Sequence, residues 1–139
     1  MDKKKLILDF IKENNLAVLS TVSQENTSES AVLEFGETDN FEIIFDCFSS
    51  AKKYKNLKQN RNVSLVIGWD ENITVQYEGL AEEVDGEEKK KYQKIYWNKN
   101  PKAERWASKE GMTYFKVKPI WIRYSNLNKS PWEVFEITF

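Results

Sequence analysis

Apolar and polar side chains alternate along several short stretches of this chain, which is the pattern of half-buried β-strands. The longest stretch spans residues 73–84, with its apolar side chains on one face and polar ones on the other. Strands are predicted at residues 16–22, 30–35, 41–46, 63–69, 73–84, 114–124 and 132–139. Residues 63–69 are almost all apolar, so we expect this strand in the centre of the sheet.

Two residues inside these strands predict irregular pairing. Gly79 indicates a bulge or a close approach of neighbouring backbone. Pro119 lacks an N–H donor and argues for an edge position or a bulge. Short polar turns separate strands at residues 23–27, 36–40, 70–72 and 125–131. Such short connections favour an antiparallel sheet or barrel over a fold with parallel strands and crossover helices.

Helical signals are confined to a few segments. Asp2 can cap a first helix whose apolar residues recur on one face. A short helix follows Ser50, a heavily charged one begins at Gly86, and Pro101 opens another short one. The chain shows no repeat or linker. The sequence therefore predicts one domain over residues 1–139, mainly β and antiparallel, with short flanking helices.

Composition excludes several classes of function. The net charge of −1 provides no electrostatic footprint for nucleic acid or an anionic membrane, and no apolar run approaches the roughly 20 residues of a membrane span. The basic start, Met1 to Lys5, leads into an amphipathic segment and not into a secretory signal. Cys47 is the only cysteine. We expect a cytoplasmic protein that binds neither nucleic acid nor membrane.

The chain contains no histidine. This absence removes Ser-His-Asp and Cys-His nucleophilic catalysis, histidine-based zinc sites and the usual proton shuttle at neutral pH. No metal site is expected. If the protein is an enzyme, its reactive centre is expected to come from an organic cofactor and not from its side chains.

The clearest chemical signal lies between Phe45 and Leu57. A strand ends there, Ser49 and Ser50 follow, and a short helix opens with Lys52 and Lys53. Backbone N–H groups at a helix start, the positive end of the helix dipole and two ammonium groups together form a phosphate site. The alternative is that these lysines form a solvated helix face and that Ser50 is only a cap.

This stretch resembles the phosphate-binding region of the pyridoxamine 5′-phosphate oxidase-like split-barrel flavoproteins. In that family a strand ends in Thr, a Ser-Arg-Lys triplet and a helix with Leu follow, and Asn precedes the next strand. The matching residues here are Cys47, Ala51, Lys52, Lys53, Leu57 and Asn60. Segments 17–22, 31–36, 66–69, 74–79 and 114–124 resemble the family's barrel strands in order and spacing. The last segment resembles a bacterial subgroup similar to general stress proteins.

The resemblance implies a split barrel that binds FMN and forms a homodimer, with each flavin at the interface. It implies that Lys52 and Lys53 hold the FMN phosphate, assisted by Ser49 or Ser50. Lysine suits this role because its ammonium group acts as a point charge toward a phosphate dianion. The small-molecule substrate and the reductant are not specified by the resemblance.

The resemblance also implies which residues surround the rest of the flavin. Backbone groups of Ala31, Val32 and Leu33 are expected along the isoalloxazine ring and ribityl chain, together with those of Asp46 and Cys47. For the Cys47 thiol, packing is the alternative to a redox role.

Four residues of later strands complete the expected site. Thr74 or Gln76 would bond to the polar edge of the ring, and Trp121 would come from the partner subunit. Arg123 is a candidate for a phosphate or for the carbonyl edge of the flavin, and a salt bridge is the plainer alternative. For the tryptophans Trp69, Trp121 and Trp132, packing in the core or at the dimer interface is favoured over ring stacking.

The chain departs from the oxidases in its substrate groups. It lacks their His and Arg pair near the C-terminus, and Ala31 stands in place of their arginine on the second barrel strand. Pyridoxamine phosphate oxidation is therefore not the expected reaction. Two hypotheses remain: an FMN-dependent oxidoreductase of unknown substrate, or a non-catalytic flavin-binding module of the stress response. A related cofactor, deazaflavin or haem, is a third; haem is disfavoured because no histidine or methionine stands at an obvious axial position.

Overall fold

The computed structural model describes residues 2–139, which form one eight-stranded antiparallel sheet with three α-helices and one 3-10 helix. The helices are α1 (Lys3–Glu13), α2 (Lys52–Gln59), α3 (Gly86–Lys99) and the 3-10 helix η1 (Pro101–Trp106). The strands are β1 (Leu16–Val22), β2 (Ser28–Glu34), β3 (Gly36–Glu37), β4 (Ile43–Phe48), β5 (Asn62–Ile67), β6 (Ile73–Glu83), β7 (Met112–Asn126) and β8 (Glu133–Thr138). Among residues 2–139, no helix is long and apolar enough to cross a membrane.

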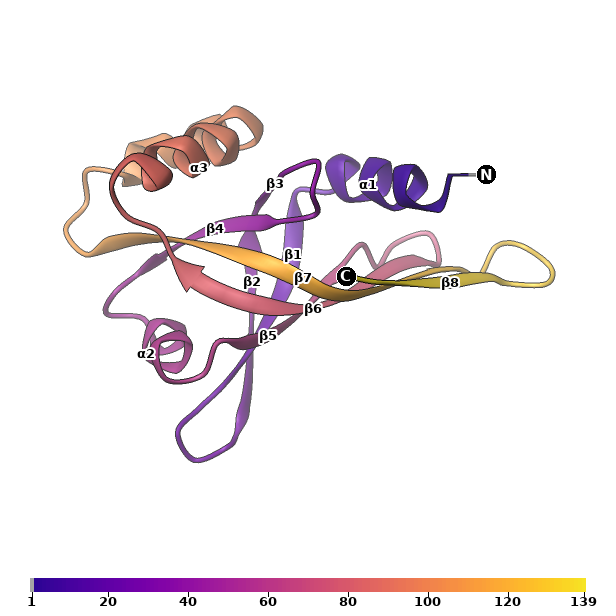
Figure 1. The fold of residues 1–139 in the computed structure, drawn as a ribbon, viewed down its shortest axis with the longest axis horizontal. Coiled ribbons are helices and arrows are strands. Elements are labelled where there is room, and N and C mark those ends of the chain that lie inside the picture. Colours follow the sequence, from indigo (N-terminus) through magenta and orange to yellow (C-terminus); the bar gives the residue numbers. More distant parts are fainter. Residues whose placement is uncertain (1) are drawn as a thin grey trace.

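The strands are ordered β2-β1-β5-β6-β7-β4-β3, and β8 pairs with β7. Strand β5 lies inside the sheet, as its apolar sequence predicts. The long strand β7 pairs with β6 along most of its length, while its other edge pairs first with β4 and then with β8. Figure 1 shows β7 and β8 extending together from the curved body of the sheet. The three α-helices lie at three separate places around the sheet.

The pairing of β6 with β7 contains the irregularity that Gly79 and Pro119 predict. Gly79 pairs with Pro119, the preceding residue of β6 pairs with Trp121, and Ile120 is left over as the bulged residue. A side chain at Gly79 would contact the Val117 Cγ1 atom at 2.7 Å and come closer still to a β7 carbonyl. The bulge and the close approach are both confirmed. Pro119 pairs only with β6, because β4 pairs with β7 up to Val117 and β8 pairs with it from Trp121 onward.

Two apolar layers hold the sheet. In the larger, Ile7 and Ile11 of α1 and Leu57 of α2 pack against buried strand residues. The smaller lies on the opposite side of β4 and β7, where Tyr92 and Tyr96 of α3 pack. The first half of β7 is therefore buried on both faces, since one face contacts each layer.

Several predicted boundaries need correction. Strand β2 begins two residues earlier than expected, and β4 is shifted toward the C-terminus because Phe41 adopts a positive φ of 65° inside a turn. Residues 36–37, expected as part of a break, pair with β4 as the short strand β3. Strand β5 ends before Gly68, whose φ is 75°. Trp69 and Trp132 are 47% and 66% exposed, so core packing is wrong for both.

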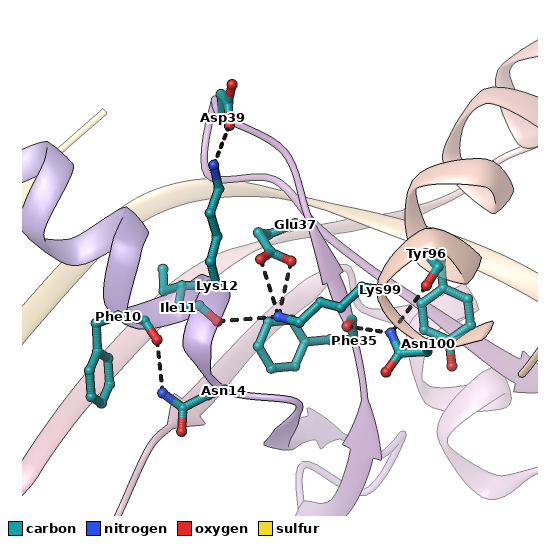
Figure 2. Close-up of polar contacts among 10 residues, drawn as sticks. All are labelled: Phe10, Ile11, Lys12, Asn14, Phe35, Glu37, Asp39, Tyr96, Lys99 and Asn100. Atoms are coloured by element: carbon teal, nitrogen blue, oxygen red, sulfur yellow. Dashed lines mark hydrogen bonds and ion pairs between the residues drawn. The ribbon is translucent and has the colours of Figure 1, made fainter. Parts of the chain in front are cut away.

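A buried ion pair joins α1, β3 and α3 (Figure 2). The Lys99 ammonium at the end of α3 lies 3.1 Å from a Glu37 carboxylate oxygen, donates to the Ile11 carbonyl at 3.2 Å, and sits 3.9 Å from the centre of the Phe35 ring. The neighbouring Asn100 amide donates to the Phe35 carbonyl at 2.8 Å. These contacts fix the end of α3 against the sheet, and with it the start of η1.

Candidate cofactor cleft

The structure forms a cleft of about 430 Å³ where β2 and β4 meet the start of α2 and the α3–η1 segment. A second, smaller hollow of about 170 Å³ adjoins it, and Ala51 and Lys53 line both. The residues that line the larger cleft are Leu16, Val32, Leu33, Glu34, Asp46, Cys47, Phe48, Ala51, Lys53, Tyr96, Ala103, Trp106 and Met112. The larger hollow is lined mainly by apolar and aromatic side chains, and the smaller one by both Lys52 and Lys53.

Seven of the predicted site residues line these two hollows. Val32, Leu33, Asp46 and Cys47 lie in the larger one, Ala31 and Lys52 in the smaller one, and Lys53 in both. They come from β2, β4 and α2, which the fold brings to one corner of the sheet. The resemblance and the geometry thus select the same corner of the molecule.

Ser49 and Ser50 line neither hollow. Both are exposed, and the Ser49 N–H donates to the Gly111 carbonyl at 2.7 Å. The N-cap residue of α2 is Ala51, and among residues 2–139 no side chain caps this helix end, so the alternative role of Ser50 as a cap is wrong. The Tyr54 N–H donates to the Ala51 carbonyl at 3.1 Å, so the N–H groups of Lys52 and Lys53 are the ones available to bind an anion there.

Asp46 and Cys47 form the inner wall of the cleft at the end of β4. Burial raises the pKa of the Asp46 carboxyl, and the Tyr96 hydroxyl that faces it partly offsets this effect. Burial also raises the pKa of the Cys47 thiol to about 11, with Lys53 opposing the shift. The thiol is therefore protonated at neutral pH, which favours packing over nucleophilic or redox chemistry for Cys47.

The remaining predicted residues, Thr74, Gln76, Trp121 and Arg123, lie away from both hollows, on the outward-facing side of β6 and β7. Arg123 forms an ion pair with Glu136 of β8 at 3.7 Å, which is the plainer of the two roles expected for it. The Trp121 indole donates to the same carboxylate at 2.6 Å. Within one chain, therefore, none of these four residues lines the cleft to which Lys53 belongs.

The sequence did not reveal the far wall of the cleft. Tyr96, Ala103 and Trp106 reach it because α3 and η1 fold back over β4 and β7, and Met112 at the start of β7 completes it. The available signal was the spacing of Tyr92 and Tyr96, four residues apart on one helix face, which indicates packing against a neighbour. A methionine, Met112, does line the cleft. Within residues 2–139 no group of three or more Cys, Asp or Glu residues is arranged to hold a metal ion.

Comparison with known proteins agrees with this fold. No curated protein matches the chain. Among solved structures, the chain is similar to a heme binding protein from Mycobacterium smegmatis, with a TM-score of 0.84 and 14% identity over 99% of this chain and 59% of that one. It thus spans less than two thirds of that protein. It is also similar to General Stress Protein 26 from Bacillus anthracis, with a TM-score of 0.75 and 25% identity over 99% of this chain and 100% of the other.

These structural similarities show the mainly antiparallel split barrel that the sequence predicts. The sequence similarity goes further, because it identifies the family. Residues 4–126 match the family described as pyridoxamine 5′-phosphate oxidase, which covers β1 to β7 and the whole cleft. The match extends over most of the chain, and the strand order and the residues of the cleft agree with it. The chain belongs to the pyridoxamine 5′-phosphate oxidase family.

Proposed function

We propose that this chain binds FMN in the cleft between β2, β4, α2 and the α3–η1 segment, and that it works as a flavin-dependent oxidoreductase. The observation that carries the proposal is the pair of adjoining hollows, of which the smaller is lined by Lys52 and Lys53 and the larger has aromatic walls. Its size lies in the range of small-molecule sites, about 300–1,000 Å³.

The residues present fit a flat aromatic ligand with an anionic tail. Tyr96 and Trp106 offer aromatic surface in the body of the cleft, and Leu33 and Met112 add apolar surface. At the other end, Lys53 lines both hollows, and within residues 2–139 it forms no ion pair. The free ammonium of Lys53 would therefore be the main group that holds the phosphate.

Bound FMN would supply hydride or electron transfer, and the chain would orient it and its partner molecule. The raised pKa of Asp46 suits a carboxyl group that exchanges a proton inside the cleft. The α3–η1 wall would limit the access of water to the ring. The second hypothesis, a non-catalytic flavin-binding module, predicts the same binding without turnover by any reductant.

We also propose that two chains associate through the outward-facing side of the sheet. Val32, Gln76 and Arg123 lie in one register row across the sheet, on the face opposite the main core. Val32 lines the cleft and is 61% exposed. A second copy on this face would reach the cleft mouth, and its Thr74, Gln76, Trp121 or Arg123 could contact the ligand there. Sedimentation of the purified chain tests this, and a monomer at all concentrations would contradict it.

Haem is a second candidate because Met112 lines the cleft and because the similar mycobacterial protein is a heme binding protein.

We also propose a cytoplasmic location, because a buried free cysteine suits a reducing compartment.

The decisive experiment is the visible spectrum of the purified chain, before and after incubation with FMN or haem, with chromatography of whatever it releases on denaturation. We expect flavin absorption and release of FMN. Lys53→Ala should weaken FMN binding by about tenfold or more, since a charge-assisted contact to phosphate is lost. The matched control is Lys55→Ala, which removes a charge from the same helix outside both hollows.

Saturation with haem but not FMN would contradict the proposed cofactor. If the chain binds FMN but no nicotinamide or chemical reductant bleaches it, the oxidoreductase proposal fails and the binding module stands. Equal losses in the two lysine variants would show that the phosphate is not held at the start of α2.

A further inference from the structure

The small hollow at the start of α2 contains a carboxylate that the two-lysine description of the site leaves out. Glu29 of β2 lines this hollow together with Lys52 and Lys53. One of its carboxylate oxygens lies 2.5 Å from the Lys52 ammonium, and its side chain is only 21% exposed. Of the two lysines at this end of the proposed site, Lys52 is thus already paired with an anion of the protein, and Lys53 is the one whose ammonium forms no ion pair within residues 2–139.

The position of this carboxylate is fixed independently of the lysine. Its second oxygen accepts a hydrogen bond of 2.6 Å from the Asn56 side chain. Asn56 is 4% exposed, and the same amide nitrogen donates to the Thr21 hydroxyl at 3.0 Å. Because β1, β2 and α2 each contribute a member of this chain of bonds, Glu29 cannot swing away from the hollow without breaking them.

The net charge of this hollow determines how strongly it binds a phosphate. Lys52 and Asn56 lower the pKa of Glu29, so the carboxylate is ionised at neutral pH. The hollow therefore carries a net charge of +1, whereas two free lysines would give +2. A phosphate monoester carries about −1.5 to −2 at pH 7. Its entry either displaces Glu29 from Lys52 or leaves the phosphate and the carboxylate to share the two ammonium groups of the hollow.

We propose that Glu29 is a specificity-determining residue that competes with the ligand phosphate for Lys52 and so lowers the preference of this site for a phosphorylated flavin over the same flavin without phosphate. The inference rests on the proposed function and deepens it. Two features would then weaken phosphate binding: the Glu29 carboxylate in the hollow, and Ala31 in place of the family's arginine.

The test compares the dissociation constants of FMN and riboflavin for the full chain and for Glu29→Gln, measured by quenching of flavin fluorescence. Glutamine keeps an oxygen that can accept the hydrogen bond from Asn56. The variant should bind FMN about tenfold more tightly and riboflavin within about twofold of the unchanged chain. The matched control is Glu25→Gln, which removes a nearby charge that contributes only a through-space effect on Lys52. It should change both constants by less than about twofold.

An FMN-to-riboflavin affinity ratio in Glu29→Gln equal to that of the unchanged chain would overturn the inference. So would an equal gain in Glu25→Gln, because general charge and not the contact with Lys52 would then be responsible. If Glu29→Gln does not fold, Glu29→Ser provides the same comparison with a smaller polar side chain.

Failure of the proposed function would look different, since neither flavin would bind to any of these chains. In that case inorganic phosphate is the probe, followed through the amide signals of residues 51–54 in NMR spectra. Tighter phosphate binding by Glu29→Gln than by the unchanged chain would still support competition for Lys52. Equal phosphate affinity would overturn it.

Discussion

The ion pair between Lys99 and Glu37 gives the sharpest prediction about stability. The two side chains are 13% and 6% exposed. Replacing Lys99 with Met leaves the Glu37 carboxylate buried without its partner and removes a donor from the Ile11 carbonyl. Breaking a buried pair on one side costs about 3–5 kcal/mol. This is a large part of the roughly 5–15 kcal/mol by which domains are stable.

Urea denaturation of the full chain and Lys99→Met measures this change directly. The matched control is Lys12→Met, because the Lys12–Asp39 pair has a similar length of 3.0 Å but its side chains are 48% and 83% exposed. Both lysines appear in Figure 2, and both link a helix to the segment around β3. Exposed pairs contribute about 0–1 kcal/mol, so we expect Lys99→Met to lose at least about 2 kcal/mol more than the control.

A double variant separates loss of the pair from loss of packing. If the unpaired carboxylate causes the damage, adding Glu37→Gln to Lys99→Met should recover about 1–2 kcal/mol, because the remaining buried group is neutral. Equal losses in Lys99→Met and Lys12→Met would refute the reasoning that burial sets the cost. No recovery in the double variant would show that Lys99 stabilises the fold through its packing and its contact with the Phe35 ring.

Three further predictions concern the core and the cleft. Gly79→Ala should destabilise the fold by about 1–3 kcal/mol in urea denaturation, since its methyl group would meet the β7 backbone, and an unchanged midpoint would contradict the close approach. Tyr77→Phe should cost about 1–3 kcal/mol by leaving the buried Phe41 carbonyl without the hydroxyl that donates to it at 2.6 Å; a loss below about 0.5 kcal/mol would contradict this. Burial raises the pKa of the Cys47 thiol to about 11, against 9.0 in the unfolded chain. The free energy of unfolding is therefore unaffected by this group below pH 9, and it decreases above pH 9 because the unfolded thiol ionises first. Stability should therefore fall by up to about 3 kcal/mol between pH 9 and 11, and Cys47→Ser should remove that part of the fall.

Local sequence patterns were sufficient to predict much of the sheet. Strand β1 matches its predicted bounds because its alternation is regular and polar turns bracket it. The bulge could be predicted because Gly79 and Pro119 each violate the ordinary rules for strands. The start of β4 could not be predicted, since Phe41 is buried like a strand residue yet lies in a turn with positive φ. Its burial depends on packing against distant segments, and neighbouring residues do not encode it.

The same limit applies to the cleft. Lys52, Lys53 and the end of β4 are contiguous enough to be recognised as a unit. Tyr96 and Trp106 join them only after α3 and η1 pack over β4 and β7, which is a long-range event. Glu29 stands in a strand, where its spacing indicates a face but not a partner. Sequence reasoning therefore predicted the lysines and the cleft residues of β2 and β4, and it missed the far wall and the Glu29 carboxylate.

The extra residue at Ile120 makes the length of β7 as important as its composition. Before the bulge the odd-numbered residues Phe115 and Val117 face the main core, and after it the even-numbered Ile122 and Tyr124 do. Deleting one residue between Val117 and Ile122 would remove the bulge and restore regular alternation against β6, so Ile122 and Tyr124 would still face the core. Natural loss of a single residue should therefore be tolerated at this bulge, whereas a single-residue change elsewhere in β7 would turn the side chains that follow it to the wrong face. Longer changes should accumulate freely in the β7–β8 turn.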